Sequence, residues 1–178
     1  GATIKADITN FTNSILISQD ASTGTLDSAN NNTGLGDSVF DDLTSGDENT
    51  GVGSLSLTKL TTGGGNSALG YNSLAAVTTG NHNTAIGRSA LEANTTAAEN
   101  TAIGFAALGV NTTGASNVAV GFQSLDANTT ASNNTAVGIN SLGANTTGDL
   151  NVAVGREAMK DNTTGSENTG VGRNALAA

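Results

Sequence analysis

Apolar and polar residues along this chain recur in a fixed order that fits neither a helix nor a simple alternating strand. From Asn32 onward an Asn returns every seventeen residues without insertion, nine times in all. We number each repeat from this Asn as position 0. Position 2 is then Ala or Gly, position 3 is aliphatic, position 4 is Gly, and position 8 is large and apolar in every copy. A constant period of this length indicates a stacked-repeat protein.

The length and the glycines of the repeat favour a β-solenoid. Seventeen residues are too few for a helix-turn-helix repeat, and Gly at position 4 would break a continuous helix. We expect a short strand at positions 1 to 3, a turn at position 4, and a second short strand or a single helical turn at positions 5 to 9. The Asn-Thr-Thr triplet at positions 11 to 13 would be the corner to the next coil. The predicted fold is therefore all-β, a β-solenoid or parallel β-roll with coils about 4.8 Å apart.

Stacking places equivalent side chains above one another, so each invariant position predicts a column. The amides at position 0 can form a ladder in which each amide donates and accepts, and Gly at position 4 permits a turn or a close backbone approach. These structural ladders comprise Asn83, Asn100, Asn117, Asn134, Asn151, Asn168, Gly87, Gly104, Gly121, Gly138, Gly155 and Gly172. Positions 3 and 8 are expected to form two core columns, comprising Ile86, Ile103, Val120, Val137, Val154, Leu91, Leu108, Leu125, Leu142 and Met159.

Residues 1–31 depart from the period and form a separate segment, whereas residues 32–178 hold eight full repeats and a partial ninth. Asn13 to Ser18 resembles the core of a repeat, as a distorted first coil would. Alternation in the residues before it predicts a strand, which either caps the first coil or docks on another subunit. The chain opens without Met and stops within the ninth repeat. We therefore expect a piece of a longer protein, or a subunit whose last coil is covered by the next subunit in a head-to-tail filament.

Composition points to a shared core. Leu, Ile, Val and Phe make up 36 of the 178 residues, which is little for an isolated rod. We therefore favour a homotrimer over a single narrow coil filled with Ala. The net charge of −9 with only six Lys and Arg argues against nucleic acid or an anionic membrane as a partner. No apolar run is long enough for membrane insertion, and the absence of Cys excludes disulfides and thiolate metal sites.

Two of the repeats carry a resemblance to known proteins. The segments Asn117 to Gly121 (NVAVG) and Asn83 to Gly87 (NTAIG) resemble the head repeats of trimeric autotransporter adhesins. The longer seventeen-residue unit is similar to repeats in tail-fibre proteins of marine phages. The resemblance spans residues 32–178. It implies a trimeric, left-handed parallel β-roll on a bacterial surface or virion, with a host surface or glycan as the receptor.

No constellation of residues predicts catalysis, a cofactor or a metal site. The single histidine, His82, occupies a variable corner position, and Gly63 to Gly65 lacks the Lys-Ser/Thr of a phosphate loop. The acidic stretch from Asp37 to Glu48 could bind calcium, but it matches neither the EF-hand loop nor the glycine-rich nonapeptide. Solvated surface charge is the simpler interpretation, and we expect a protein that is not an enzyme.

The Asn-Thr-Thr triplets allow two further interpretations. They match the N-glycosylation acceptor sequence, although a repeated structural corner explains all of them at once. Rows of Thr on a flat solenoid face can also bind ice, but neighbours in an extended segment point to opposite sides. Only one Thr of each pair can then face outward, which gives a single row. The expected surface row is Thr95, Thr112, Thr129, Thr146 and Thr163.

The sequence thus predicts a structural rod of an extracellular or virion fibre that supports attachment to a host or surface. A self-assembling head-to-tail extracellular filament subunit is the alternative, and an ice-binding solenoid is the third possibility. The expected location is extracellular, on a cell surface or on a virion.

Overall fold

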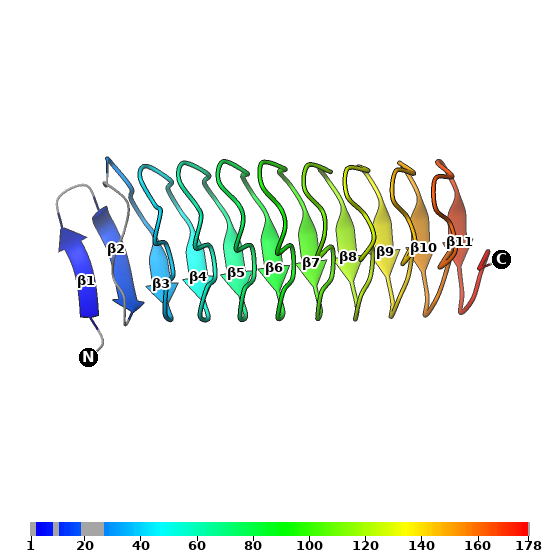
Figure 1. Cartoon of the computed structure of the whole chain (residues 1–178), viewed down its shortest axis with the longest axis horizontal. Helices are drawn as coiled ribbons and strands as arrows, with labels where there is room; N and C mark the ends of the chain where they lie inside the picture. Colours follow the sequence, from blue (N-terminus) through cyan, green and yellow to red (C-terminus); the bar gives the residue numbers. More distant parts are fainter. Residues whose placement is uncertain (1–2, 9–10, 19–26, 178) are drawn as a thin grey trace.

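The structure, a computed structural model that describes residues 3–8, 11–18 and 27–177, is an elongated β-solenoid (Figure 1). Successive coils follow one another along the long axis, and each contributes one strand to a single sheet. The predicted all-β solenoid is thereby confirmed. The strands are β1 Thr3–Ile8, β2 Phe11–Ser18, β3 Thr33–Leu35, β4 Thr50–Val52, β5 Ser67–Leu69, β6 Thr84–Ile86, β7 Thr101–Ile103, β8 Val118–Val120, β9 Thr135–Val137, β10 Val152–Val154 and β11 Thr169–Val171.

The sheet keeps the register that the repeat dictates. Neighbouring strands from β2 to β11 run parallel, and from β3 onward each residue pairs with the residue one repeat further along. Ala85, for example, lies opposite Ala102. Because no repeat contains an insertion, every coil supplies the same side chains at the same place, and columns extend along the whole array.

The segment before the first repeat adds two strands to this sheet. β2 pairs parallel with β3, and Leu16 lies opposite Gly34. Leu16 is buried, and a Cβ at Gly34 would lie 2.6 Å from its Cδ1, so Gly34 makes room for the larger neighbour. Ile15 pairs with Thr33, so Asn13 falls one residue short of the position 0 column. β1 pairs antiparallel with β2 and forms the outer edge of the sheet.

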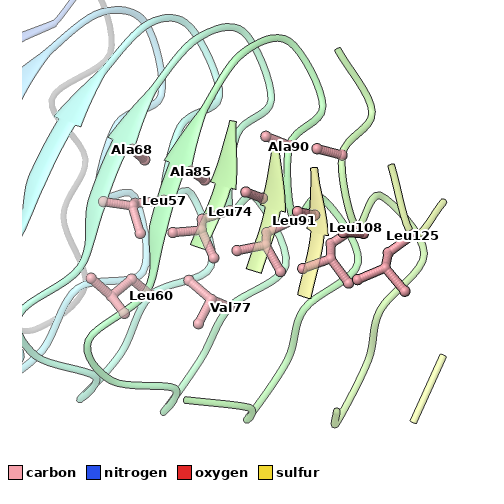
Figure 2. Packing of buried hydrophobic residues seen from close by; sticks show 14 of the residues in the cluster. Leu57, Leu60, Ala68, Leu74, Val77, Ala85, Ala90, Leu91, Leu108 and Leu125 are labelled. Atoms are coloured by element: carbon pink, nitrogen blue, oxygen red, sulfur yellow. The ribbon is translucent and has the colours of Figure 1, made fainter. Parts of the chain in front are cut away.

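The interior of each coil is narrow because mostly small side chains point into it. In the middle coils, positions 0, 2, 7, 8, 11 and 14 are buried. Position 8 supplies the bulk of the apolar contact, and its residues stack into one column (Figure 2). Ala68 and Ala85 at position 2 face that column from the strands. The column consists of Phe40, Leu57, Leu74, Leu91, Leu108, Leu125, Leu142 and Met159.

The aliphatic residues at position 3 do not lie in the core, and that expectation is wrong. Side chains alternate between the two faces of a strand. Ala85 at position 2 points inward and is fully buried, so Thr84 and Ile86 on either side of it point outward. Ile86 is 39% exposed. The other predicted residues of this column also face outward, half-buried or exposed, namely Ile103, Val120, Val137 and Val154.

Positions 4 to 11 form two consecutive tight turns rather than a second strand or a helical turn. The N–H of Ser56 donates to the carbonyl of Gly53 at 3.2 Å, and the N–H of Leu60 donates to that of Leu57 at 3.2 Å. Residues at positions 6 and 8 have a left-handed backbone, with φ of 57° at Ser89 and 50° at Leu91. This conformation is unusual outside glycine. At position 8, complete burial of the side chain offsets its cost.

Gly at position 4 meets two independent requirements. Gly104 has φ of 137°, a conformation that side chains rarely permit. A Cβ on Gly104 would also overlap the carbonyl group of Gly121 in the next coil. The same overlap recurs from Gly36 to Gly155, which explains why this position never varies within the array.

Candidate functional surface

The Asn at position 0 forms a buried ladder through the array. Asn83 donates from Nδ2 to Oδ1 of Asn66 at 3.1 Å and to the carbonyl of Ala97 across the interior at 2.9 Å. Its own Oδ1 accepts from the backbone N–H of Asn100 at 3.0 Å and from the Asn100 amide at 3.3 Å. Each amide is thereby satisfied without water. At Asn134 the side-chain N–H donates to the carbonyl of Ser132 instead, and only the backbone link to Asn117 remains.

A second amide ladder lies at position 11, the first residue of each Asn-Thr-Thr triplet. Asn128 donates to Oδ1 of Asn111 at 2.9 Å and to the carbonyl of Ala131 at 3.0 Å. The first three repeats carry Leu43, Leu60 and Val77 at this position. Buried asparagines cannot carry a glycan in the folded rod, which removes the glycosylation interpretation for Asn94, Asn111, Asn128 and Asn145. From the sequence we predicted a corner at these residues, but not that their side chains point into the interior.

The two Thr residues of each triplet differ in their surroundings. At position 12, the hydroxyl of Thr95 donates to the carbonyl of Thr112 at 3.2 Å, and Thr112 donates likewise to Thr129 at 3.0 Å. Thr146 donates to Thr163 in the same way. The predicted surface row therefore binds the next coil, and Thr129 and Thr163 are its exposed members. The fully outward row lies one residue later, at Thr96, Thr113, Thr130, Thr147 and Thr164.

Candidate chemistry does not converge anywhere on the described part of the chain. His82 is exposed, and the residues that the structure describes contain no group of three or more acidic or His side chains that could hold a metal ion. Asp42 pairs with Lys59 at 3.1 Å, and Asp47 accepts from the N–H of Asn30 at 2.6 Å. The acidic stretch is thus distributed around the coil.

Asp126 is a titratable residue whose environment shifts its pKa. Burial raises the pKa of its carboxyl group, and a backbone hydrogen bond partly opposes that rise.

A continuous apolar face is the most conspicuous surface feature. It is the outer side of β3 to β11, with Thr or Val at position 1 in most coils and an aliphatic residue at position 3 in all of them. Leu69, Ile86 and Ile103 are 50%, 39% and 37% exposed. Monomeric soluble proteins rarely leave an apolar strip of this length open, and such strips mark interaction sites. We refer to positions 1 and 3 of these strands as the outer face.

An aromatic and cationic column borders the outer face at position 5. The guanidinium of Arg88 lies 5.8 Å from the ring centres of both Tyr71 and Phe105. Phe105 stacks on Phe122 with ring centroids 5.3 Å apart and planes 13° apart. Tyr71, Phe105 and Phe122 remain 41% to 49% exposed. The coils thus present large apolar side chains directly beside the outer face.

A shallow groove of about 590 Å³ runs over four coils on another side of the rod. Its lining comes from positions 6, 9 and 10 and consists mostly of small side chains such as Ala76, Ala93 and Gly109. Lys59 and Glu92 are the charged residues that line it. No polar groups converge inside it, so the groove does not resemble a catalytic cleft.

Residues of the described ranges form no helix capable of crossing a membrane. Comparison of the chain with protein-family models, curated proteins and solved structures yields no match.

Proposed function

We propose that this protein is a non-enzymatic structural rod of an extracellular or virion fibre, and that copies associate side by side as a homotrimer through the outer face. The observation that carries the proposal is the exposed aliphatic column at position 3, which continues without a break along an uninterrupted parallel sheet. The role is mechanical, because repetition supplies length and stiffness.

The ladders support a load-bearing role. The amides at position 0 and the large apolar side chains at position 8 connect the coils along the array, and the amides at position 11 add a second ladder from Asn94 onward. In a repeat array each unit contacts only its neighbours, so stiffness depends on the quality of these contacts. The repeat length is constant, and no coil is interrupted by a loop that would let the rod bend.

The outer face supports association between copies. β3 to β11 at about 4.8 Å spacing give an outer face about 40 Å long. With the flanking positions 16 and 5 included, at most about 20 Å across, the area is on the order of 800 Å², which a trimer divides between two neighbouring copies. Two parts of the proposal rest on the resemblance to adhesin heads and tail-fibre repeats. They are the number of three copies and the attachment to a host surface or glycan.

Sedimentation equilibrium of paired variants tests the association. Ile86→Lys with Ile103→Lys adds two charges to the outer face, whereas Thr96→Lys with Thr113→Lys adds them to the outward Thr row. We expect the first variant to be a single chain of 17.4 kDa and the control to keep the mass of the unaltered protein, three times that value. Equal masses for both variants and the unaltered chain would contradict the proposal.

A head-to-tail filament is the second candidate. It would use the sheet edges of β1 and β11. β1 lengthens the sheet by one antiparallel strand, and such an edge strand offers unpaired backbone groups to a further strand. Deleting residues 1–13 should abolish concentration-dependent elongation under this proposal and leave a shorter soluble rod under the first one.

Ice binding is the third candidate. The outward Thr row is single, because the other Thr of each pair donates its hydroxyl to the next coil. A flat ice-binding face would need paired ranks of Thr. A measurement of thermal hysteresis that finds none at millimolar protein would remove this candidate.

A further inference from the structure

The outer face repeats every coil, and this repetition leaves two features of a side-by-side assembly undefined. A copy shifted by one coil would bury nearly the same residues at positions 1 and 3. A copy with reversed direction would also find aliphatic side chains. Direction and register therefore need residues that differ from coil to coil. Such residues flank the outer face on both sides.

One flank carries positive charge and the other carries negative charge. Position 5 follows each strand, and all three arginines of the chain occupy it; we name this flank the arginine edge. Position 16 precedes each strand, and three of the five glutamates occupy it; we name this flank the glutamate edge. All six side chains are exposed, namely Arg88, Arg156 and Arg173 on one edge and Glu48, Glu99 and Glu167 on the other.

Most of these charges have no ionic partner within the described part of the chain. Arg88 contacts two aromatic rings, and Arg156 pairs with its neighbour Glu157 at 3.0 Å. No ion pair joins the glutamate edge to another described residue, although Glu99 accepts a hydrogen bond from Ser116 at 3.1 Å. The strand lies between the two edges, at most about 20 Å across, and no ion pair joins one edge to the other among the described residues.

Building on the proposed side-by-side association, we propose that copies run parallel and form a closed ring in which the arginine edge of one copy contacts the glutamate edge of the next. A rotation axis parallel to the rods produces this contact at every interface. A two-fold axis across the rods would instead set the arginine edge against itself, where Asp37 is the acidic residue at position 5. Complementary charges favour the ring and fix the direction of the copies.

The apolar members of the edges agree with this pairing. Ile139 on the arginine edge and Leu150 on the glutamate edge belong to the same repeat, as do Arg88 with Glu99 and Arg156 with Glu167. Both Ile139 and Leu150 are exposed, at 47% and 53%. Three of the eight complete repeats thus match in kind, apolar with apolar or cation with anion, whereas Asp37 and Glu48 of the first repeat are both acidic. Along the rod axis, the two partners of such a pair differ in height by at most about one strand spacing of 4.8 Å. Long side chains can span this distance.

Disulfide cross-linking tests the contact directly, because the chain has no cysteine of its own. Phe105→Cys places a thiol on the arginine edge, and Glu99→Cys or Ser116→Cys places one on the glutamate edge at two neighbouring heights. A disulfide needs Cα atoms within about 7 Å, so one chain cannot bridge its own two edges. Under mild oxidation we expect at least one double variant to give bands of two and three chains and no larger band. Each single variant should stay a single chain on a denaturing gel.

Other outcomes overturn the inference in distinguishable ways. Cross-linked pairs from Phe105→Cys alone would show that the arginine edge faces itself. Double variants that remain single chains, while sedimentation of the same samples gives three copies, would place the contact elsewhere and leave the proposed function intact. Single chains in both experiments would contradict the association itself.

Charge reversal gives a second, independent test of the contact. Arg88→Glu should weaken association about tenfold, and the double variant Arg88→Glu with Glu99→Arg should recover most of that loss. A double variant that recovers nothing would argue against an arginine–glutamate contact.

Discussion

Asn100 donates three hydrogen bonds that connect three segments of the rod. Its backbone N–H and its side-chain amide donate to Oδ1 of Asn83 at 3.0 and 3.3 Å, and the amide also donates to the carbonyl of Gly114 at 2.9 Å. One side chain thus ties its coil to the preceding coil and closes its own coil across the interior. This explains why an uncharged donor and acceptor of this size recurs at position 0.

Replacing Asn100 with Asp should destabilise the rod strongly. A carboxylate cannot donate to Asn83 or Gly114, and it would be a fully buried charge facing the two oxygens that now accept from the Asn100 amide. We expect a loss of about 3 kcal/mol or more in the free energy of unfolding, measured by urea denaturation. Asn81→Asp is the matched control, because Asn81 is exposed: its Oδ1 accepts from the N–H of Gly64, and the hydrogen bond that its Nδ2 donates to the carbonyl of Thr79 is open to solvent. An equal effect of both substitutions would contradict the importance of the buried ladder.

Alanine at position 4 and at position 9 should have opposite consequences. Gly104→Ala forces a side chain into φ of 137° and into the carbonyl of Gly121, so we expect a loss of about 2 kcal/mol or more. Gly143→Ala fills a position that Ala75 occupies in another coil, and it should be neutral or stabilise the fold by up to about 1 kcal/mol. Thermal unfolding of the two variants measures both effects. A tolerated Ala at Gly104 would refute the close backbone approach.

Two residues with a left-handed backbone allow the effect of backbone strain on stability to be measured separately from the effect of side-chain burial. Ala106 and Leu108 have φ of 52° and 49°. Gly relieves the strain at either site, but only Leu108→Gly empties the core column. We expect Ala106→Gly to raise the melting temperature slightly and Leu108→Gly to cost about 3 kcal/mol. Stabilisation by both substitutions would mean that the column contributes little.

The second amide ladder predicts non-additive substitutions. Asn128→Leu removes one rung and leaves the Oδ1 of Asn111 without its donor, which should cost about 2 kcal/mol. Changing Asn94, Asn111, Asn128, Asn145 and Asn162 to Leu together should cost much less than five times that amount, because the first repeats already hold Leu43 and Leu60 at this position. Unfolding in urea of the single and fivefold variants gives the comparison, and strict additivity would contradict it.

Asp126 gives a pH dependence of known sign. Burial raises its pKa in the folded state above the unfolded value of 3.8, so the folded state binds the proton more tightly. Its contribution to stability is therefore present below the unfolded pKa and declines as the pH rises through the folded pKa. The Asp126→Asn variant lacks this carboxyl group, so its free energy of unfolding should lack this contribution to the pH dependence. We expect the stability of the unaltered protein to fall relative to the variant as the pH rises from below 3.8, and a rise would contradict the assignment.

The period and the spacing of small residues were enough to predict the solenoid, its parallel register and the core column at position 8. The side that faces outward was not predicted correctly, although the signal was present. Asn83 and Ala85 are two residues apart and both inside, so Ile86 must point outward by alternation. Constant aliphatic character at position 3 suggested a core, but it equally suits a face that another chain would cover.

The tight turns and the inward Asn of the triplet lay beyond what the sequence could show. Leu at a left-handed position gives no local signal, because its burial overrides its conformational preference. Asn94 reads as a turn residue in isolation, since Asn is common in turns. Its second role becomes visible only when the coils are stacked and Asn111 lies directly within reach of its Oδ1 at 3.3 Å.

Mass per unit length, obtained from small-angle X-ray scattering combined with light scattering, tests most directly whether the outer face joins copies side by side. We predict three times the single-chain mass of 17.4 kDa in a particle no longer than one solenoid, about 45 Å from β2 to β11. A particle with the mass per length of one chain, whether it stays short or grows longer with concentration, would contradict the account.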